Sequence, residues 1–169
     1  MEVINIFTDG STLNNQKKGN RIGGSGVFFG DNDDRNLMLP LKETKLLKVT
    51  NQVSELTACV KAIEIVSSTE KLDNKKVIIY TDSMYIVNSI TKWAKNWEKK
   101  NWTKSNGKVI ENLELMKTLY QLSLKFKINF KHVKAHKVEP DKNSKNYYLW
   151  YGNFMADKLA VDAAKTLLP

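Results

Sequence analysis

The fold is decided by Val3-Ile4-Asn5-Ile6-Phe7-Thr8-Asp9-Gly10-Ser11, residues 3–11 of the chain. Apolar residues alternate along this stretch, which then runs into an acid and a turn, and this predicts a first strand over residues 2–9. Residues 77–83, Val77-Ile78-Ile79-Tyr80-Thr81-Asp82-Ser83, also form an apolar run that ends in an acid. A continuous apolar run is typical of a central strand buried on both faces. Because the carboxyl ends of neighbouring parallel strands meet at one edge of a sheet, we expect Asp9 and Asp82 to lie close together.

The rest of the chain alternates between strand and helix patterns. Strands are expected over residues 23–30, 36–40 and 128–133. Helical spacing of apolar residues predicts helices over 51–67, after Asp82-Ser83, over 109–126 and over 155–168, with a polar loop over 137–148. Three strands followed by helix, strand, helices, strand and helix predict an α/β fold with one mixed sheet flanked by helices. We expect one domain, residues 1–169.

Charge and cysteine content narrow the partners and the compartment. The chain has 27 Lys and Arg residues against 18 Asp and Glu residues, a net charge of +9, which favours a polyanionic partner such as nucleic acid. No apolar stretch approaches the roughly 18–20 residues of a membrane span, and no signal peptide is recognisable at the start. The single cysteine, Cys59, excludes an internal disulfide and fits the cytoplasm or another reducing intracellular compartment, the nucleus included.

Four acids, Asp9, Glu55, Asp82 and Asp157, stand at or near the ends of predicted strands and helices. Each has an ordinary structural interpretation as a turn residue, a solvated helix position, a cap region or a first-turn acid favoured by the helix dipole. If they converge, however, the uncompensated carboxylates repel one another and raise each other's pKa. A hard divalent cation such as Mg²⁺ relieves that repulsion. The four acids therefore predict a metal site.

Six segments of the chain resemble, in order, the signature segments of type 1 ribonuclease H. The fourth corresponds to the basic protrusion, or handle, of that family, and the likeness covers nearly the whole chain. The segments are Thr8-Asp9-Gly10-Ser11, residues 50–56 (Thr50 to Leu56), residues 80–85 (Tyr80 to Tyr85), residues 90–102 (Ile90 to Trp102), Val133-Lys134-Ala135-His136 and residues 152–160 (Gly152 to Ala160).

The resemblance implies a ribonuclease H-like fold, a five-stranded mixed sheet with helices on both faces. It also implies endonucleolytic cleavage of the RNA strand of RNA/DNA hybrids, with two Mg²⁺ ions, or Mn²⁺ as a substitute, and with 5′-phosphate and 3′-hydroxyl products. By the same resemblance Asp9 bridges both ions, Glu55 and Asp82 hold one flank, and Asp157 holds the other. We expect the protein to act as a monomer.

His136 matches the family histidine on the loop beside the metals, where a neutral imidazole suits proton transfer. The alternative is a surface loop histidine without chemistry; we expect His132, four residues earlier, to be a strand residue without chemistry. The chain departs from the family after His136, where residues 137–156 replace a short glycine-containing link. The aromatic run 147–151 within this insertion either packs over the terminal helix or offers a stacking surface for nucleic acid.

Tryptophans and lysines interleave in the handle, a pattern suited to a sugar–phosphate backbone. The alternative is that the tryptophans pin a short helix to the body, above all Trp102. The resemblance implies three groups of substrate contacts, of which the third reads the 2′-hydroxyl that distinguishes RNA. They are Tyr85 and Trp93 on the DNA strand; Lys48, Thr50 and Asn112, assisted by Ser105, on a DNA phosphate; and Asn15, Asn51, Gln52 and the backbone near Thr12 and Met84 on the RNA. Trp97, one helical turn from Trp93, is also expected to bind substrate.

The sequence thus indicates a metal-dependent endoribonuclease, a hydrolase of phosphodiester bonds. Three alternatives remain on the same fold: a hybrid-binding module without catalysis, a DNA-processing enzyme of the integrase or resolvase kind, and a ribonuclease H domain derived from a reverse transcriptase. Intact acids argue against the first alternative, and Asn51-Gln52 with the Trp/Lys handle argues against the second. A start at Met1 and a self-contained pattern argue against the third.

Overall fold

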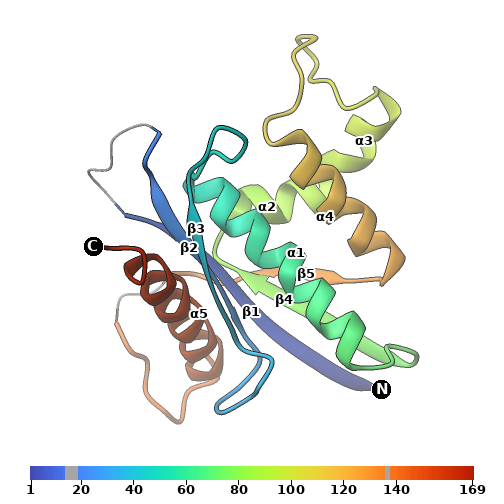
Figure 1. Cartoon of the computed structure of the whole chain (residues 1–169). Coiled ribbons are helices and arrows are strands. Elements are labelled where there is room, and N and C mark those ends of the chain that lie inside the picture. The colour runs from blue at the N-terminus through green and yellow to red at the C-terminus, as the bar shows by residue number, and fades with distance from the viewer. Residues whose placement is uncertain (14–18, 136–137) are drawn as a thin grey trace.

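A computed structural model describes residues 1–13, 19–135 and 138–169. Its strands and helices follow the order that the sequence predicts (Figure 1). The elements are β1 (Glu2–Thr12), β2 (Ile22–Phe28), β3 (Leu37–Lys42), α1 (Asn51–Thr69), β4 (Lys75–Thr81), α2 (Met84–Asn88), the π-helical turn η1 (Ser89–Trp93), α3 (Ala94–Lys99), α4 (Leu113–Lys125), β5 (Asn129–His132) and α5 (Tyr147–Lys165).

The five strands form one mixed sheet in the order β3-β2-β1-β4-β5. β1 is antiparallel to β2 and parallel to β4, and β5 continues the parallel half. Phe7 of β1 lies beside Tyr80 of β4. Asp9 and Asp82 each lie two residues further along the chain, so both acids lie at the same edge of the sheet. The predicted five-stranded mixed sheet is confirmed.

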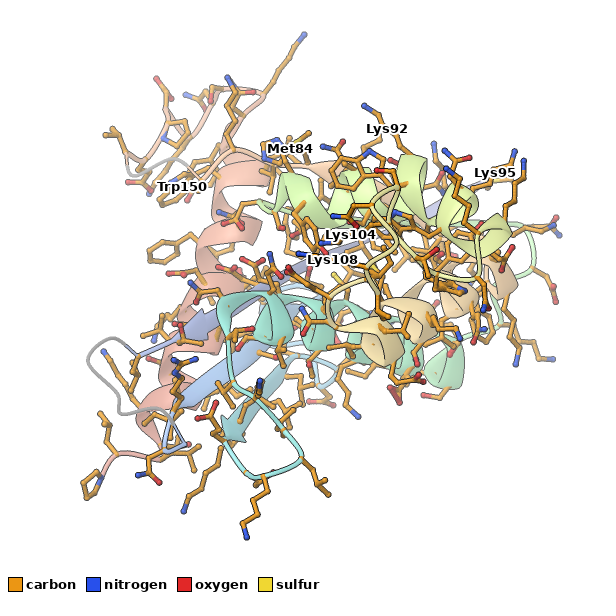
Figure 2. All side chains as sticks on the ribbon, turned by 90° about the horizontal axis from the view of Figure 1, so that it is seen from above. Met84, Lys92, Lys95, Lys104, Lys108 and Trp150 are labelled. Carbon is orange, nitrogen blue, oxygen red and sulfur yellow. The ribbon has the colours of Figure 1, made fainter. Side chains whose placement is uncertain are left out.

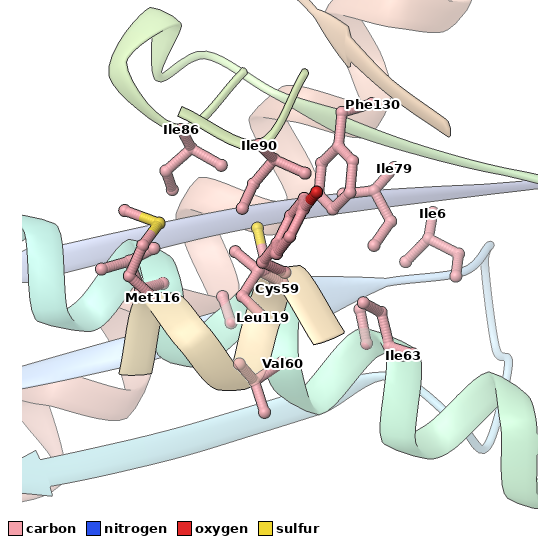
Figure 3. Close-up of a cluster of buried hydrophobic side chains, with 14 of the residues drawn as sticks. Ile6, Cys59, Val60, Ile63, Ile79, Ile86, Ile90, Met116, Leu119 and Phe130 are labelled. Carbon is pink, nitrogen blue, oxygen red and sulfur yellow. The ribbon is translucent and has the colours of Figure 1, made fainter. Parts of the chain in front are cut away.

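Helices cover both faces of the sheet: α1 and α4 lie on one face and α5 on the other (Figure 1). Side chains alternate along β1, so Ile4 and Ile6 face α1 while Phe7 faces α5. The larger core, between the sheet and α1 and α4, contains Ile6, Ile63, Ile79 and Leu119 (Figure 3). Burying each such side chain contributes about 1.5–3 kcal/mol, so the core holds the helices in place on the sheet.

Cys59 lies in this core, fully buried, with its sulfur 3.4 Å from the hydroxyl oxygen of Thr8. Burial raises the pKa of the thiol to about 12, so the group stays protonated and unreactive. None of the helices in the described ranges is both long and apolar enough to cross a membrane.

The terminal helix begins earlier than the sequence predicts. A polar loop was expected over 137–148 and a helix from residue 155, but α5 begins at Tyr147. The aromatic residues 147, 150, 151 and 154 recur at helical spacing, and this periodicity extends the helix toward its N-terminus. The predicted inserted loop 137–156 is therefore wrong beyond residue 146. Asp157 consequently lies within α5 rather than in its first turn.

Two further boundaries differ from the expected ones. The helix predicted over 109–126 begins at Leu113, because Asn112 has a left-handed backbone with φ 55°. An α-helix cannot include that conformation, although asparagine tolerates it well. The helical stretch after Ser83 is interrupted by the π-helical turn η1. Such turns shift the phase of the side chains that follow, here Trp97 relative to Tyr85.

Candidate active site

Three of the four predicted acids come together at the carboxyl edge of β1 and β4. One carboxylate oxygen from each of Asp9, Glu55 and Asp82 lies within 4.8 Å of the others. Asp9 belongs to β1, Asp82 directly follows β4, and Glu55 is the fifth residue of α1. Clustered carboxylate oxygens of this kind are the ligands that Mg²⁺ and Mn²⁺ prefer.

Glu55 reaches the cluster because α1 begins in direct contact with β1. A Cβ atom at Gly10 would lie 2.3 Å from the backbone nitrogen of Glu55, so only glycine allows this approach. The hydroxyl of Thr50 caps the helix by accepting a 3.1 Å hydrogen bond from the Val53 N–H. The close contact at Gly10 and the Thr50 cap together hold the first turns of α1 next to Asp9.

Asp157 is brought to the same edge by a second close contact, between α5 and β2. Gly26 pairs with Asp9 across the sheet, and a Cβ atom there would lie 2.2 Å from the Ala156 carbonyl oxygen. The exposed side chain of Asp157 then hydrogen-bonds Asp9. The fourth acid therefore joins the cluster through Asp9, on the side opposite Glu55.

The electrostatics of the cluster favour a bound cation. Burial raises the pKa of Asp9, and the charge of Asp82 and the hydrogen bond with Asp157 raise it further. Burial and Asp82 likewise raise the pKa of Glu55 to about 7. Within the described ranges, no lysine or arginine forms an ion pair with any of the four acids. A divalent ion would supply the missing positive charge and displace the protons.

Two neighbours of Asp82 were not predicted from the sequence. Burial raises the pKa of Asp82, but a hydrogen bond from the buried Asn153 opposes that shift. Asn153 stands four residues before Asp157 on α5, which places both on one helix face. His132, expected to have no role, has its Nε2 atom 3.2 Å from the Asp82 carbonyl oxygen. In the sequence, only the four-residue spacing of Asn153 and Asp157 could have indicated that Asn153 lies beside the acids.

Several predicted substrate residues surround the start of α1 and are linked to one another. The Thr12 hydroxyl donates a 2.5 Å hydrogen bond to Asn51 Oδ1, which ties α1 to β1. The Asn112 amide donates a 3.3 Å hydrogen bond to Gln52 Oε1, which ties α1 to the start of α4. Lys48, also predicted to contact substrate, is exposed on the loop before α1.

The handle carries a chain of aromatic rings that runs from its surface into the core. Ring centroids are 6.3 Å apart for Tyr85–Trp93, 6.0 Å for Trp93–Trp97 and 6.4 Å for Trp97–Trp102. Trp102 is buried and so pins the handle, whereas Trp93 remains 40% exposed. Tyr85, Trp93, Trp97, Lys104 and Ser105 line one hollow. Figure 2 shows lysines along this side of the molecule (Lys92, Lys95, Lys104 and Lys108).

Three predicted site residues have different outcomes. His136 and Asn15 fall outside the described residues, so their roles stay predictions. Met84, the first residue of α2, is 46% exposed and lies near Asp82 in sequence.

Fold and site together define an α/β protein with a carboxylate cluster at the carboxyl ends of adjacent parallel strands. The RNase H family model matches residues 1–165. The ribonuclease H of Ruthia magnifica is 34% identical over 161 residues, which cover 95% of this chain and 94% of that protein. The chain therefore belongs to the RNase H family, which confirms the resemblance to type 1 ribonuclease H.

Other relatives are longer than this chain. Ribonuclease H of Schizosaccharomyces pombe is 34% identical over 155 residues, covering 92% of this chain and 50% of that protein. Human ribonuclease H1 is 32% identical over 164 residues, covering 97% of this chain and 51% of that protein. The chain thus spans about half the length of these two relatives.

Solved structures share the fold. LC9-RNase H1, described as a type 1 RNase H with the type 2 active-site motif, has a TM-score of 0.72 at 23% identity, over 99% of this chain and 74% of that chain. LC11-RNase H1 in complex with an RNA/DNA hybrid has a TM-score of 0.63 at 21% identity, over 98% of this chain and 99% of that chain.

Proposed function

We propose that this protein is a metal-dependent endoribonuclease that hydrolyses the RNA strand of RNA/DNA hybrids. The observation that carries the proposal is the cluster of Asp9, Glu55 and Asp82, whose oxygens converge with no lysine or arginine ion-paired to them in the described part of the chain. Family membership supports the choice of substrate, since the relatives are named ribonuclease H and LC11-RNase H1 binds a hybrid. The net charge of +9 suits a polyanion.

The donor set fits Mg²⁺, with Mn²⁺ as a substitute, because the ligand atoms that converge among the described residues are carboxylate oxygens. Asp9 lies between the other ligands, with a hydrogen bond to Asp157 and an oxygen within 4.8 Å of one from Asp82, which supports a role for it in holding both ions. Glu55 and Asp82 would hold one ion, and Asp157 the other. When bound, two such ions supply an activated water and charge stabilisation for the departing 3′ oxygen, which gives 5′-phosphate and 3′-hydroxyl ends.

The chain's own residues orient these ligands and hold the substrate. Asn153 fixes the Asp82 carboxylate, and Ser83 hydrogen-bonds Glu55. Asn51 and Gln52, at the start of α1, would contact the 2′-hydroxyls of the RNA strand. Across the cluster, the exposed Trp93 of the handle would contact the DNA strand.

The test incubates the protein with Mg²⁺ and four labelled substrates: the RNA/DNA hybrid, double-stranded RNA, double-stranded DNA and single-stranded RNA. We expect cleavage of the hybrid alone. Asp82→Asn should bind the hybrid without cleaving it, and Asp162→Asn on α5, outside the cluster, should keep wild-type activity. Cleavage of DNA, or binding of the hybrid by the wild type without cleavage, would contradict the proposal. The second result would indicate a non-catalytic hybrid-binding module.

We further expect a monomer in a reducing intracellular compartment, in keeping with the single buried cysteine. Light scattering across a range of protein concentrations tests the oligomeric state.

A further inference from the structure

A stripe of aromatic side chains lies on the first half of α5. We call Tyr147, Trp150 and Phe154 the aromatic stripe. The Trp150 and Phe154 rings are stacked, with centroids 5.1 Å apart and planes 19° apart. Tyr147 and Trp150 follow with centroids 5.7 Å apart. Phe154 is 47% exposed, so the outer end of this stack faces solvent.

The aromatic stripe leads directly to the acid cluster. Residues three or four apart share one face of a helix, so Tyr147, Trp150, Phe154 and Asp157 form one continuous row. The row is about 15 Å long, at about 1.5 Å per residue. In Figure 2 Trp150 lies on one side of Met84, and the handle lysines Lys92 and Lys95 lie on the other. A strand that crosses the acids could therefore continue along α5, away from the handle.

Basic side chains lie beside the aromatic stripe. Trp150 lines a hollow together with Lys134 and His132, and none of the described residues that line it is an acid. Lys134 is exposed and has no ion-pair partner among the described residues. Aromatic faces combined with nearby cations are the means by which proteins hold single-stranded nucleic acid, because bases stack on the rings and phosphates meet the cations.

We infer that the aromatic stripe binds unpaired nucleotides of an RNA tail that continues from the hybrid past the acid cluster. Bases within a duplex are already stacked on one another, so only an unpaired tail offers free faces to Phe154 and its neighbours. The inference rests on the proposed function for its choice of nucleic acid. It assigns to this protein a preference for hybrids that end in a single-stranded RNA extension.

The test compares blunt hybrids with hybrids that carry an unpaired RNA tail at either end. In the Asp82→Asn background, binding is followed by fluorescence anisotropy. Phe154→Ala should weaken binding of one of the two tailed hybrids by roughly tenfold, since base–aromatic stacking is worth about 1–3 kcal/mol per base, and leave the blunt hybrid unaffected. Phe154→Trp should retain tail binding. Tyr148→Leu is the matched control, because Tyr148 packs edge-on against Phe7 on another face of α5.

The outcomes separate this inference from the proposed function. Equal affinity of Phe154→Ala and the parent for every tailed hybrid, or an equal loss for blunt and tailed hybrids, would overturn it. Anisotropy does not require cleavage, so a catalytically silent protein would refute the proposed function while the tail measurement still decides the inference. Unchanged melting temperatures of the variants exclude misfolding as the cause of any difference.

Discussion

The contact between α5 and β2 predicts a large effect of a single methyl group at Gly26. In Gly26→Ala the new Cβ would lie 2.2 Å from the Ala156 carbonyl oxygen and 2.7 Å from the Ala160 backbone nitrogen. An ordinary carbon–oxygen contact needs about 3.5 Å, so α5 must move by about 1 Å. Both obstructing atoms belong to helix backbone and cannot rotate away. We expect a loss of about 3 kcal/mol in the free energy of unfolding, at the upper end of the usual overpacking range.

The same displacement carries Asp157 away from Asp9. Because misplacement by about 1 Å can cost about 100-fold in rate, we expect hybrid cleavage to fall by that order. Urea denaturation measures the stability, and initial cleavage rates measure the activity. Gly24→Ala is the matched control: its Cβ would lie 2.1 Å from the Ala160 carbonyl oxygen, farther along α5 from Asp157. It should destabilise the protein similarly and reduce the rate less. Wild-type stability in Gly26→Ala would refute the account of how α5 is seated.

Three further predictions follow from the shifted pKa values of Asp9, Glu55 and Glu43. Asp9→Asn should stabilise the metal-free protein by about 2 kcal/mol at neutral pH and abolish cleavage, because it removes a buried acid whose pKa is raised. Calorimetry measures the stability, and a variant less stable than the wild type would contradict the prediction. Without metal, the free energy of unfolding should fall as the pH rises from 4.5 toward about 7, because Glu55 holds its proton more tightly in the folded than in the unfolded protein. The melting temperatures of the wild type and Glu55→Gln are compared over that interval. A wild-type melting temperature that rises relative to that of the variant would refute the prediction. Glu43 accepts a 2.9 Å hydrogen bond from the Val49 N–H and has a lowered pKa. The stability that its carboxylate gives the fold should therefore disappear as the pH falls through that pKa. Glu43→Gln should show faster hydrogen exchange at the Val49 amide at neutral pH, and unchanged exchange would contradict this prediction.

The strands and the pairing of the first acids were predictable because the signals are local. An apolar run that ends in an acid places Asp9 and Asp82 at strand ends, and parallel pairing of β1 with β4 makes them neighbours. Buried Trp102 also agrees with the expectation that it anchors the handle.

The second half of the site depends on contacts that a sequence pattern does not show. The rotation of α5 about its axis is set where its backbone meets Gly26, and that rotation brings Asn153 to Asp82. The start of α5 was missed because the polar loop before it obscured the helical spacing of its aromatic residues. Asn112 delays the start of the expected helix to Leu113 through its left-handed backbone, which composition alone does not reveal.

The central claim is that the acid cluster is a divalent metal site, and calorimetric titration with Mn²⁺ or Mg²⁺ tests it most directly. At neutral pH the wild type should bind the ion and release protons, seen as a dependence of the heat on the ionisation enthalpy of the buffer, because the pKa of Glu55 is raised to about 7. Asp9→Asn should lose most of this binding. Absence of binding to the wild type, or the same titration curve for both proteins, would contradict the account.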